Sequence, residues 1–157
     1  MRRRKLGMMD DIQKLLIERS CERLMIEYCH LVDHGEAARI ADQFTEDGVW
    51  CSSENTMTGR AEIARGFQRR QDNVGRMSRH VCSNPLVEVI DESRARGVVY
   101  LTLHRHDGPA GRRSSPMNLP EVVGEYRDTF TLTSEGWRFS RRDVVADFVR
   151  RDAPAPA

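Results

Sequence analysis

Residues 10–33 read DDIQKLLIERSCERLMIEYCHLVD and govern how the rest of the chain can fold. Apolar side chains recur in this stretch at steps of three and four residues with charged ones between them, which predicts one long amphipathic helix. Asp10 or Asp11 is suited to cap the start of the helix, and Gly35 to end it. Asp33 stands at the C-terminal end, where the helix dipole disfavours a negative charge, so a carboxylate there indicates function more than capping.

Length and charge exclude several classes of protein. The chain has 157 residues, about the length of one domain, and its 25 basic and 24 acidic side chains give a net charge of +1. That balance lacks the electrostatic footprint of a nucleic-acid-binding protein. The basic residues 2–5 are followed by too short an apolar segment for a signal peptide, and no apolar stretch reaches the length of a membrane span. We therefore expect a cytoplasmic protein without nucleic-acid or membrane partners.

The remaining elements are predicted from hydrophobic period and turn residues. In chain order they are helices at 37–44 and 60–71 around a short strand at 49–51, and long strands at 78–90, 94–106, 122–133 and 137–148. Pro85 inside the first long strand indicates a bulge or a sheet edge. The segment 107–120 has no apolar period and is expected to be a mobile loop.

Helices followed by a run of long strands predict an α+β fold, with the helices on one face of a strongly curved antiparallel sheet. Sheet and helices would enclose a cone-shaped cavity suited to a small molecule. One domain is expected over residues 10–148, with a flexible basic segment at 1–9 and a disordered tail at 149–157. The four cysteines have no C-x-x-C spacing and are expected to be reduced, mostly buried thiols.

Several short motifs follow one another along the chain. They are Tyr28-x4-Asp33, Phe44-Thr-Glu-Asp-Gly-x-Trp50, Gly59-Arg60, Arg79-His80-x3-Asn84-Pro85 and Gly136-Trp-Arg-Phe-x2-Arg142. In this order and spacing the chain resembles the SnoaL-like branch of the nuclear transport factor 2-like superfamily over roughly residues 10–148. The resemblance implies a cystatin-like α+β barrel.

Some enzymes of this superfamily pair an Asp on a helix with a His on a strand. They include scytalone dehydratase, bile-acid 7α-dehydratase and hexachlorocyclohexane dehydrochlorinase, all of which carry out eliminations. Asp33 and His80 match that pair. A neutral imidazole oriented by a buried carboxylate is a competent general base, because the carboxylate fixes the tautomer and stabilises the imidazolium that forms. We therefore expect His80 to remove a proton and Asp33 to orient it.

The resemblance also suggests residues that handle the developing oxyanion or the leaving group. Arg142 falls where the dehydrochlorinase carries a functional arginine, and Tyr28 where the dehydratases use a tyrosine. His104 lies near the place of the second histidine of scytalone dehydratase, although a shift of one residue in the hairpin would bring His106 into the cavity instead. The residues expected to contact the substrate are Trp50, Met25 and Phe130.

Four histidines have spacings that bear on a metal site. His30 and His34 are four residues apart on the first helix, and His104 and His106 would share a strand face, which is a spacing that metal ligands can have. However, only one position at the end of the helix can face the cavity well, and the enzymes that the chain resembles need no cofactor. We therefore expect neither a metal nor another cofactor.

Taken together, the motifs predict a cofactor-independent lyase, a dehydratase-like enzyme for a small hydrophobic cyclic or polyketide-like substrate. An isomerase or polyketide cyclase with the same base is the enzymatic alternative. A non-catalytic ligand-binding or assembly protein is the alternative from another class. By resemblance we expect a homo-oligomer, a dimer or a trimer, and the outer sheet face with Val123, Thr129 and Thr131 is the contact surface expected for it.

Overall fold

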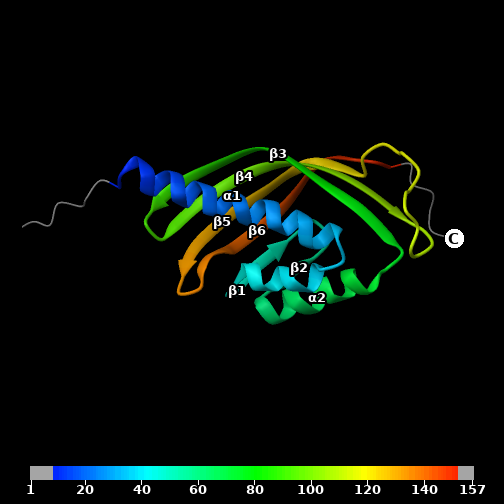
Figure 1. Ribbon diagram of the computed structural model, residues 1–157, viewed down its shortest axis with the longest axis horizontal. Coiled ribbons are helices and arrows are strands. Elements are labelled where there is room, and N and C mark those ends of the chain that lie inside the picture. Colours follow the sequence, from blue (N-terminus) through cyan, green and yellow to red (C-terminus); the bar gives the residue numbers. More distant parts are fainter. Residues whose placement is uncertain (1–8, 152–157) are drawn as a thin grey trace, which may run out of the picture.

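The long helix expected at the start of the chain is present. A computed structural model describes residues 9–151 of the protein, and helix α1 covers Asp11–Asp33 (Figure 1). Asp10 caps the helix, because its side chain accepts a hydrogen bond of 2.7 Å from the backbone N–H of Gln13. The chain turns away at Gly35, whose positive φ of 81° suits a residue without a Cβ. The predicted start and end of this helix are therefore confirmed.

The other elements follow α1 in the described residues. They are η1 (Ala37–Gln43), β1 (Phe44–Cys51), β2 (Thr56–Thr58), α2 (Arg60–Asp72), β3 (Arg76–Asp91), β4 (Arg94–Asp107), β5 (Val122–Thr133) and β6 (Gly136–Val149). The second helix, η1, is a 3₁₀ helix. The long strands and α2 lie where the sequence predicts them, whereas β2 and the first residues of β1 occupy segments in which no strand is predicted.

The sheet has six strands in the order β2-β1-β6-β5-β4-β3. Neighbouring strands are antiparallel except β1 and β6, which run parallel, so the prediction of an antiparallel sheet is wrong at this one pair. These two strands are far apart in the sequence, and no hairpin fixes their relative direction. Strands β2 and β3 form the two edges, so the sheet is curved without closing into a barrel. The predicted α+β class is confirmed.

Strand β3 is an edge strand with an irregularity at Pro85. Its pairing with β4 shifts in register between Ser83 and Leu86, and Asn84 has a positive φ of 53°. Proline cannot donate a hydrogen bond to a neighbouring strand, so it is tolerated at an edge or at a bulge. Both features that Pro85 predicts are therefore found together.

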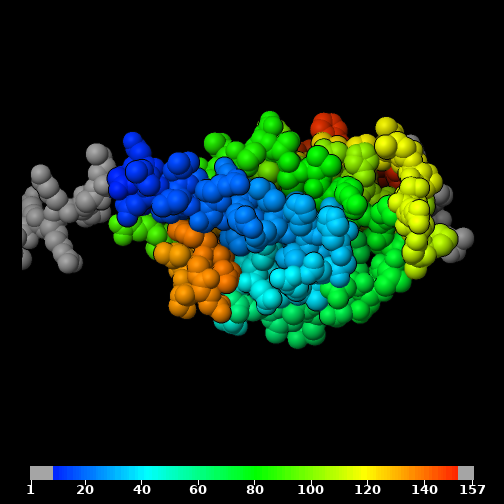
Figure 2. Space-filling model, in the orientation of Figure 1, coloured from blue at the N-terminus to red at the C-terminus, as the bar shows by residue number. Residues whose placement is uncertain are grey.

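The core lies between the sheet and α1, which crosses it with η1 and α2 beside its C-terminal half (Figure 1). Phe139 stands at the centre of the core, with its ring centroid 5.2 Å from those of Phe44 and Phe130. The buried stripe of α1 begins later than its hydrophobic period suggests, because Ile12 and Leu16 are 70% and 62% exposed. The space-filling view shows these first turns at one end of the molecule (Figure 2). The second half of α1 is therefore the part that positions the site.

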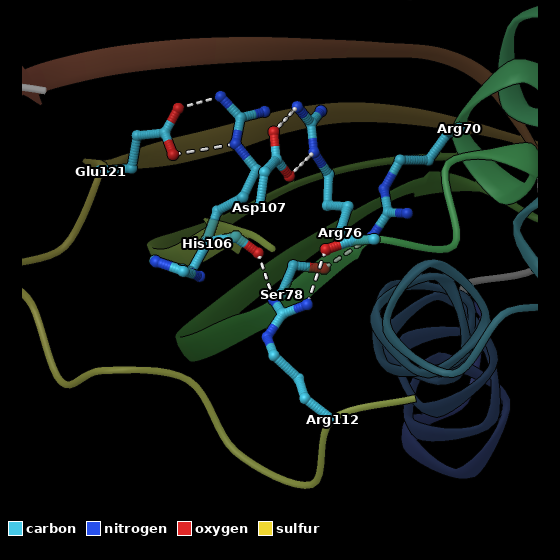
Figure 3. Close-up of polar contacts among 9 residues, drawn as sticks. Arg70, Arg76, Ser78, His106, Asp107, Arg112 and Glu121 are labelled. Carbon is cyan, nitrogen blue, oxygen red and sulfur yellow. Dashed lines mark hydrogen bonds and ion pairs between the residues drawn. The ribbon is translucent and has the colours of Figure 1, made fainter. Parts of the chain in front are cut away.

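The segment between β4 and β5 contains no helix or strand and lies at the opposite end of the molecule from the first turns of α1 (Figure 2). Arg112 anchors it by donating hydrogen bonds to the carbonyl oxygens of Gly75, His106 and Pro109 (Figure 3). The bond to Gly75 joins the segment to the residue just before β3, and the bond to His106 joins it to β4. Its mobility stays a prediction.

Most residues of the two predicted terminal segments, 1–9 and 149–157, lie outside the described range of 9–151. Val149 is an exception, because it is the last residue of β6 and pairs with Val122, so it belongs to the domain and not to a tail. Among residues 9–151, no helix has both the length and the apolar character that crossing a membrane requires.

Candidate active site

The end of α1 and the start of β3 bring Asp33 and His80 together. Nδ1 of His80 lies 2.7 Å from Oδ1 of Asp33. Two further donors reach the same carboxylate at 2.7 Å, the backbone N–H of His80 at Oδ2 and the hydroxyl of Ser78 at Oδ1. Only 5% of the Asp33 side chain and 11% of the His80 side chain are exposed. The two side chains are therefore in the contact that the sequence predicts, and their catalytic role stays a prediction.

These contacts fix the charge of Asp33 and the orientation of the imidazole. Burial alone would raise the pKa of Asp33, but the hydrogen bonds and charge of His80 and the Ser78 hydroxyl outweigh it and hold the pKa below its ordinary value. An ionised carboxylate can only accept hydrogen bonds, so Nδ1 of a neutral His80 must carry the ring proton. Nε2 is then an acceptor, and none of the residues 9–151 forms a hydrogen bond with it.

His80 lines a cavity of about 420 Å³ between the helices and the sheet, a size typical of small-molecule sites. Half of the residues that line it are apolar or aromatic, namely Tyr28, Val32, Trp50, Met57, Phe67, Leu101, Leu103, Val122, Tyr126, Val144, Ala146 and Val149. A larger hollow of about 730 Å³ lies between α1 and η1, but its lining is rich in charged side chains and includes neither Asp33 nor His80. Another hollow, of about 590 Å³, is lined by Asp33 and Arg70 but not by His80. The cavity of about 420 Å³ is therefore the candidate site, because it is the one that His80 lines.

Tyr28 and Trp50 lie in the wall of this cavity, as the sequence predicts. The indole N–H of Trp50 donates to the hydroxyl oxygen of Tyr28 at 3.0 Å. Burial, partly opposed by Arg142 and by the bond from Trp50, raises the pKa of Tyr28 to about 12, so the hydroxyl keeps its proton at neutral pH. That proton is available to an oxygen of a bound molecule. Tyr126, which the sequence did not single out, also lines the cavity, and burial raises its pKa well above the ordinary value.

Arg142 lies in the core behind this wall. Its side chain is 0% exposed and donates two hydrogen bonds to Asp128, at 2.8 and 2.7 Å. The guanidinium carbon lies 4.3, 4.2 and 4.3 Å from the ring centroids of Tyr28, Tyr126 and Phe139. The carboxylate and the rings surround the cation, and only Nη1 of its guanidinium has no hydrogen-bond partner among the described residues. This corrects the expectation that Arg142 contacts the substrate: it supports the two tyrosines from behind.

His104 and His106 lie on the other face of the sheet. In the pairing of β3 with β4, His80 lies opposite Leu103, so both point into the cavity. Successive residues of a strand point to opposite faces, so Arg105 also points into the cavity while His104 and His106 point away from it. Both histidines line a separate hollow beneath the segment between β4 and β5. The expectation that one of them faces the cavity is therefore corrected, because Arg105 holds that place.

Met25 and Phe130, predicted to contact the substrate, are core residues instead. They are 2% and 1% exposed, and neither lines the cavity. Both pack where Gly97 leaves room, since a Cβ at that position would meet the ends of both side chains. Their apolar character is thus explained by the fold alone.

The polar residues beside the candidate base were mostly missed in the sequence. Ser78 links Asp33 to Arg70, whose Nη2 donates to the Ser78 hydroxyl at 3.0 Å (Figure 3). Arg105 forms an ion pair with Glu121 at the same end of the cavity. Ser78 could have been found, because it precedes the histidine by two positions and so shares its strand face. Arg70 and Glu121 come from elements whose placement the sequence does not fix.

Within residues 9–151, no group of three or more His, Cys, Asp or Glu side chains is arranged to hold a metal ion. His30 and His34 stack on the exposed side of α1, with ring centroids 5.5 Å apart.

Solved structures share this fold. A scytalone dehydratase-like protein from Novosphingobium aromaticivorans superposes with a TM-score of 0.76 at 20% identity, over 94% of this chain and 95% of that one. An NTF2-like protein with a cystatin-like fold from the same species gives 0.67 at 26% identity, over 87% and 90%. A hexachlorocyclohexane dehydrochlorinase from Novosphingobium barchaimii gives 0.70 at 13% identity, over 90% and 93%. These likenesses show that the cystatin-like fold is shared.

Comparison of sequences identifies the family. No curated protein sequence matches the chain significantly. A family model described as the SnoaL-like domain matches residues 13–143, which is most of the chain and includes both Asp33 and His80. The chain therefore belongs to the SnoaL-like domain family.

Proposed function

We propose that the protein is a lyase that removes water, or a comparable leaving group, from a small cyclic or polyketide-like substrate. The supporting observation is the 2.7 Å contact between Asp33 and Nδ1 of His80, which leaves Nε2 without a partner among the described residues beside a cavity of about 420 Å³. Structural neighbours include a dehydrochlorinase and a scytalone dehydratase-like protein, which agrees with elimination chemistry. The proposed base consists of side chains alone and needs no cofactor.

In the proposed reaction, Nε2 of His80 takes a proton from the carbon next to a carbonyl group of the substrate. The electron pair of that C–H bond forms the new double bond, and the bond to the leaving oxygen breaks. The imidazolium then returns its proton to the leaving oxygen, so water departs and His80 is neutral again. Asp33 stabilises the imidazolium between the two transfers.

A hydrogen-bond donor must stabilise the charge that develops on the carbonyl oxygen during proton removal. Tyr28 suits this role, because its hydroxyl lines the cavity, keeps its proton at neutral pH and already accepts a bond from Trp50. We assign the role to Tyr28 in place of Arg142, whose guanidinium is fully buried against Asp128.

Turnover of simple substrates tests this proposal. A panel of small cyclic β-hydroxy ketones is suitable, because loss of water produces a conjugated enone that is followed by its ultraviolet absorbance. We expect His80→Gln to reduce the rate by about 10²–10⁴-fold, the usual contribution of a general base. His104→Gln is the matched control, since it makes the same change on the other face of the sheet. Full activity of His80→Gln would contradict the mechanism.

The same assay separates the alternatives. An isomerase using the same base would convert β,γ-unsaturated ketones into conjugated products without change of mass, so mass spectrometry of the products distinguishes it from a lyase. A cyclase would act on open-chain polyketide-like substrates and not on the cyclic panel. A ligand-binding protein would bind such compounds without converting them, and His80→Gln would then change affinity alone.

A further inference from the structure

The residues that line the candidate cavity carry more positive than negative charge. Two acidic side chains line it, Glu54 and Glu121, against four arginines, which are Arg69, Arg70, Arg105 and Arg150. Glu121 is engaged by Arg105 in an ion pair, so it does not neutralise the other arginines. The cavity thus combines apolar and aromatic lining residues with arginines that outnumber the acidic side chains.

Arg70 is the arginine of this group that lies next to the candidate base. Its Nη2 donates a hydrogen bond to Ser78 (Figure 3). The Ser78 hydroxyl donates in turn to Asp33. Among residues 9–151, no acidic side chain forms an ion pair with Arg70, and no other hydrogen bond from its guanidinium is found. Most of its donors are therefore unused, although the side chain is only partly exposed.

The neighbouring Arg76, in contrast to Arg70, has a carboxylate as its hydrogen-bond partner. Its Nε and Nη2 donate to the two carboxylate oxygens of Asp107, both at 2.8 Å (Figure 3). That pairing raises the pKa of Arg76 in spite of partial burial. For Arg70 the direction is the reverse, because burial and the positive charge of Arg76 lower its pKa and the more distant Asp33 and Asp107 only partly oppose this. An anion bound at Arg70 would remove this imbalance.

We propose that Arg70 is an anion-binding residue and that the substrate carries a carboxylate at one end. The carboxylate would accept hydrogen bonds from the unused donors of the Arg70 guanidinium. The planar fork of N–H groups in a guanidinium is well suited to bind the two oxygens of a carboxylate. The apolar part of the substrate would then lie against Trp50, Phe67 and Leu101 in the wall of the cavity. Anchoring at Arg70 fixes the end of the molecule next to Ser78 and Asp33, and so places the neighbouring carbon atoms near His80.

This inference names the substrate class of the proposed lyase site and in that sense rests on the proposed function. It replaces a mainly hydrophobic substrate by one that is apolar at one end and anionic at the other. The prediction concerns binding alone, so it is tested without turnover.

Two ligands of nearly equal shape provide the test, 1-naphthoate and its neutral amide, 1-naphthamide, measured by isothermal titration calorimetry at neutral pH. We expect the wild type to bind naphthoate about tenfold or more tightly than naphthamide, as expected for hydrogen bonds to a charged group. Arg70→Gln should remove this preference and leave the affinity for naphthamide within about twofold. Glutamine can still donate to Ser78, and the amide therefore reports whether the cavity has stayed intact.

Arg65→Gln is the matched control. It removes the same charge from an exposed position of α2 outside the cavity, and it should leave the preference for naphthoate unchanged. Arg70→Lys, which keeps the charge without the planar fork, should retain part of the preference.

Three results would overturn the proposal: equal affinities of the wild type for the two ligands, no binding of naphthoate at millimolar concentration, or an undiminished preference in Arg70→Gln. Failure of the lyase proposal is a separate result. If His80→Gln binds naphthoate normally and no elimination is found, the anion site stands without the reaction. If elimination depends on His80 but naphthoate is not preferred, the reaction stands without the anion site.

Discussion

Replacing Asp128 by asparagine should destabilise the protein strongly. The change leaves the guanidinium of Arg142 buried without its counter-charge, because both side chains are 0% exposed and share two hydrogen bonds of 2.8 and 2.7 Å. Burial alone would lower the pKa of Arg142, and in the wild type Asp128 outweighs burial and raises the pKa. The variant lacks this counter-charge, but the guanidinium stays charged in the core because the ordinary pKa of arginine is above 12. Removing one partner of a buried ion pair costs about 3–5 kcal/mol. The aromatic rings around Arg142 recover a part of that loss at most.

Urea unfolding followed by circular dichroism measures the effect. Asp143→Asn is the control, because it makes the same substitution on the next residue of β6 beyond Arg142 and breaks an ion pair with Arg141 whose side chains are 46% and 33% exposed. Exposed pairs contribute about 1 kcal/mol or less. A loss for Asp128→Asn no larger than that of Asp143→Asn would refute the reasoning that the buried pair holds the wall of the cavity.

Three further changes have defined outcomes. Asp33→Asn removes a carboxylate whose pKa is lower in the folded protein than its usual value of about 3.9. The contribution of this carboxylate to stability is therefore present at neutral pH and is lost as the pH falls through the folded-state pKa. The unfolding free energies of the wild type and the variant should thus converge below about pH 4. Tyr28→Phe leaves the indole N–H of Trp50 without its acceptor and should cost about 1 kcal/mol, with a change in tryptophan fluorescence. Gly124→Ala would place a Cβ 2.0 Å from the carbonyl oxygen of Val145, so the backbone must shift, and thermal unfolding should show a loss of about 1–3 kcal/mol.

Much of the fold could be predicted because its main elements have strong local signals. The helical period of α1 and the alternation along β4 are visible in the sequence, and tight turns tie β3 to β4 and β5 to β6. The parallel pairing of β1 with β6 could not be predicted, because it joins residues such as Trp50 and Arg142 that lie far apart in the chain. The exposure of Ile12 and Leu16 was missed for a related reason: hydrophobic period gives a face of a helix, not the length of sheet beneath it.

The candidate site was predictable only in part. Asp33 and His80 were recognised from motif spacing, and the structure brings them into contact. The assignment of His104 failed because it followed a family position instead of the strand alternation, which already directs Leu101 toward the core and His104 away from it. Arg142 was misplaced because an arginine is expected at a surface or a ligand, and nothing in the sequence shows that Asp128 lies beside it in the core.

The most direct test of the central claim is the protonation state of His80, read from the ring nitrogens in a ¹H–¹⁵N correlation spectrum at about pH 9, where histidine side chains are neutral. The His80 signals are assigned by their loss in His80→Gln. With Asp33 accepting from Nδ1, we predict a proton on Nδ1 and an unprotonated Nε2 in the wild type, and loss of this single form in Asp33→Asn. A wild-type His80 that carries its proton on Nε2 would contradict the account, since the nitrogen facing the cavity could then not accept one.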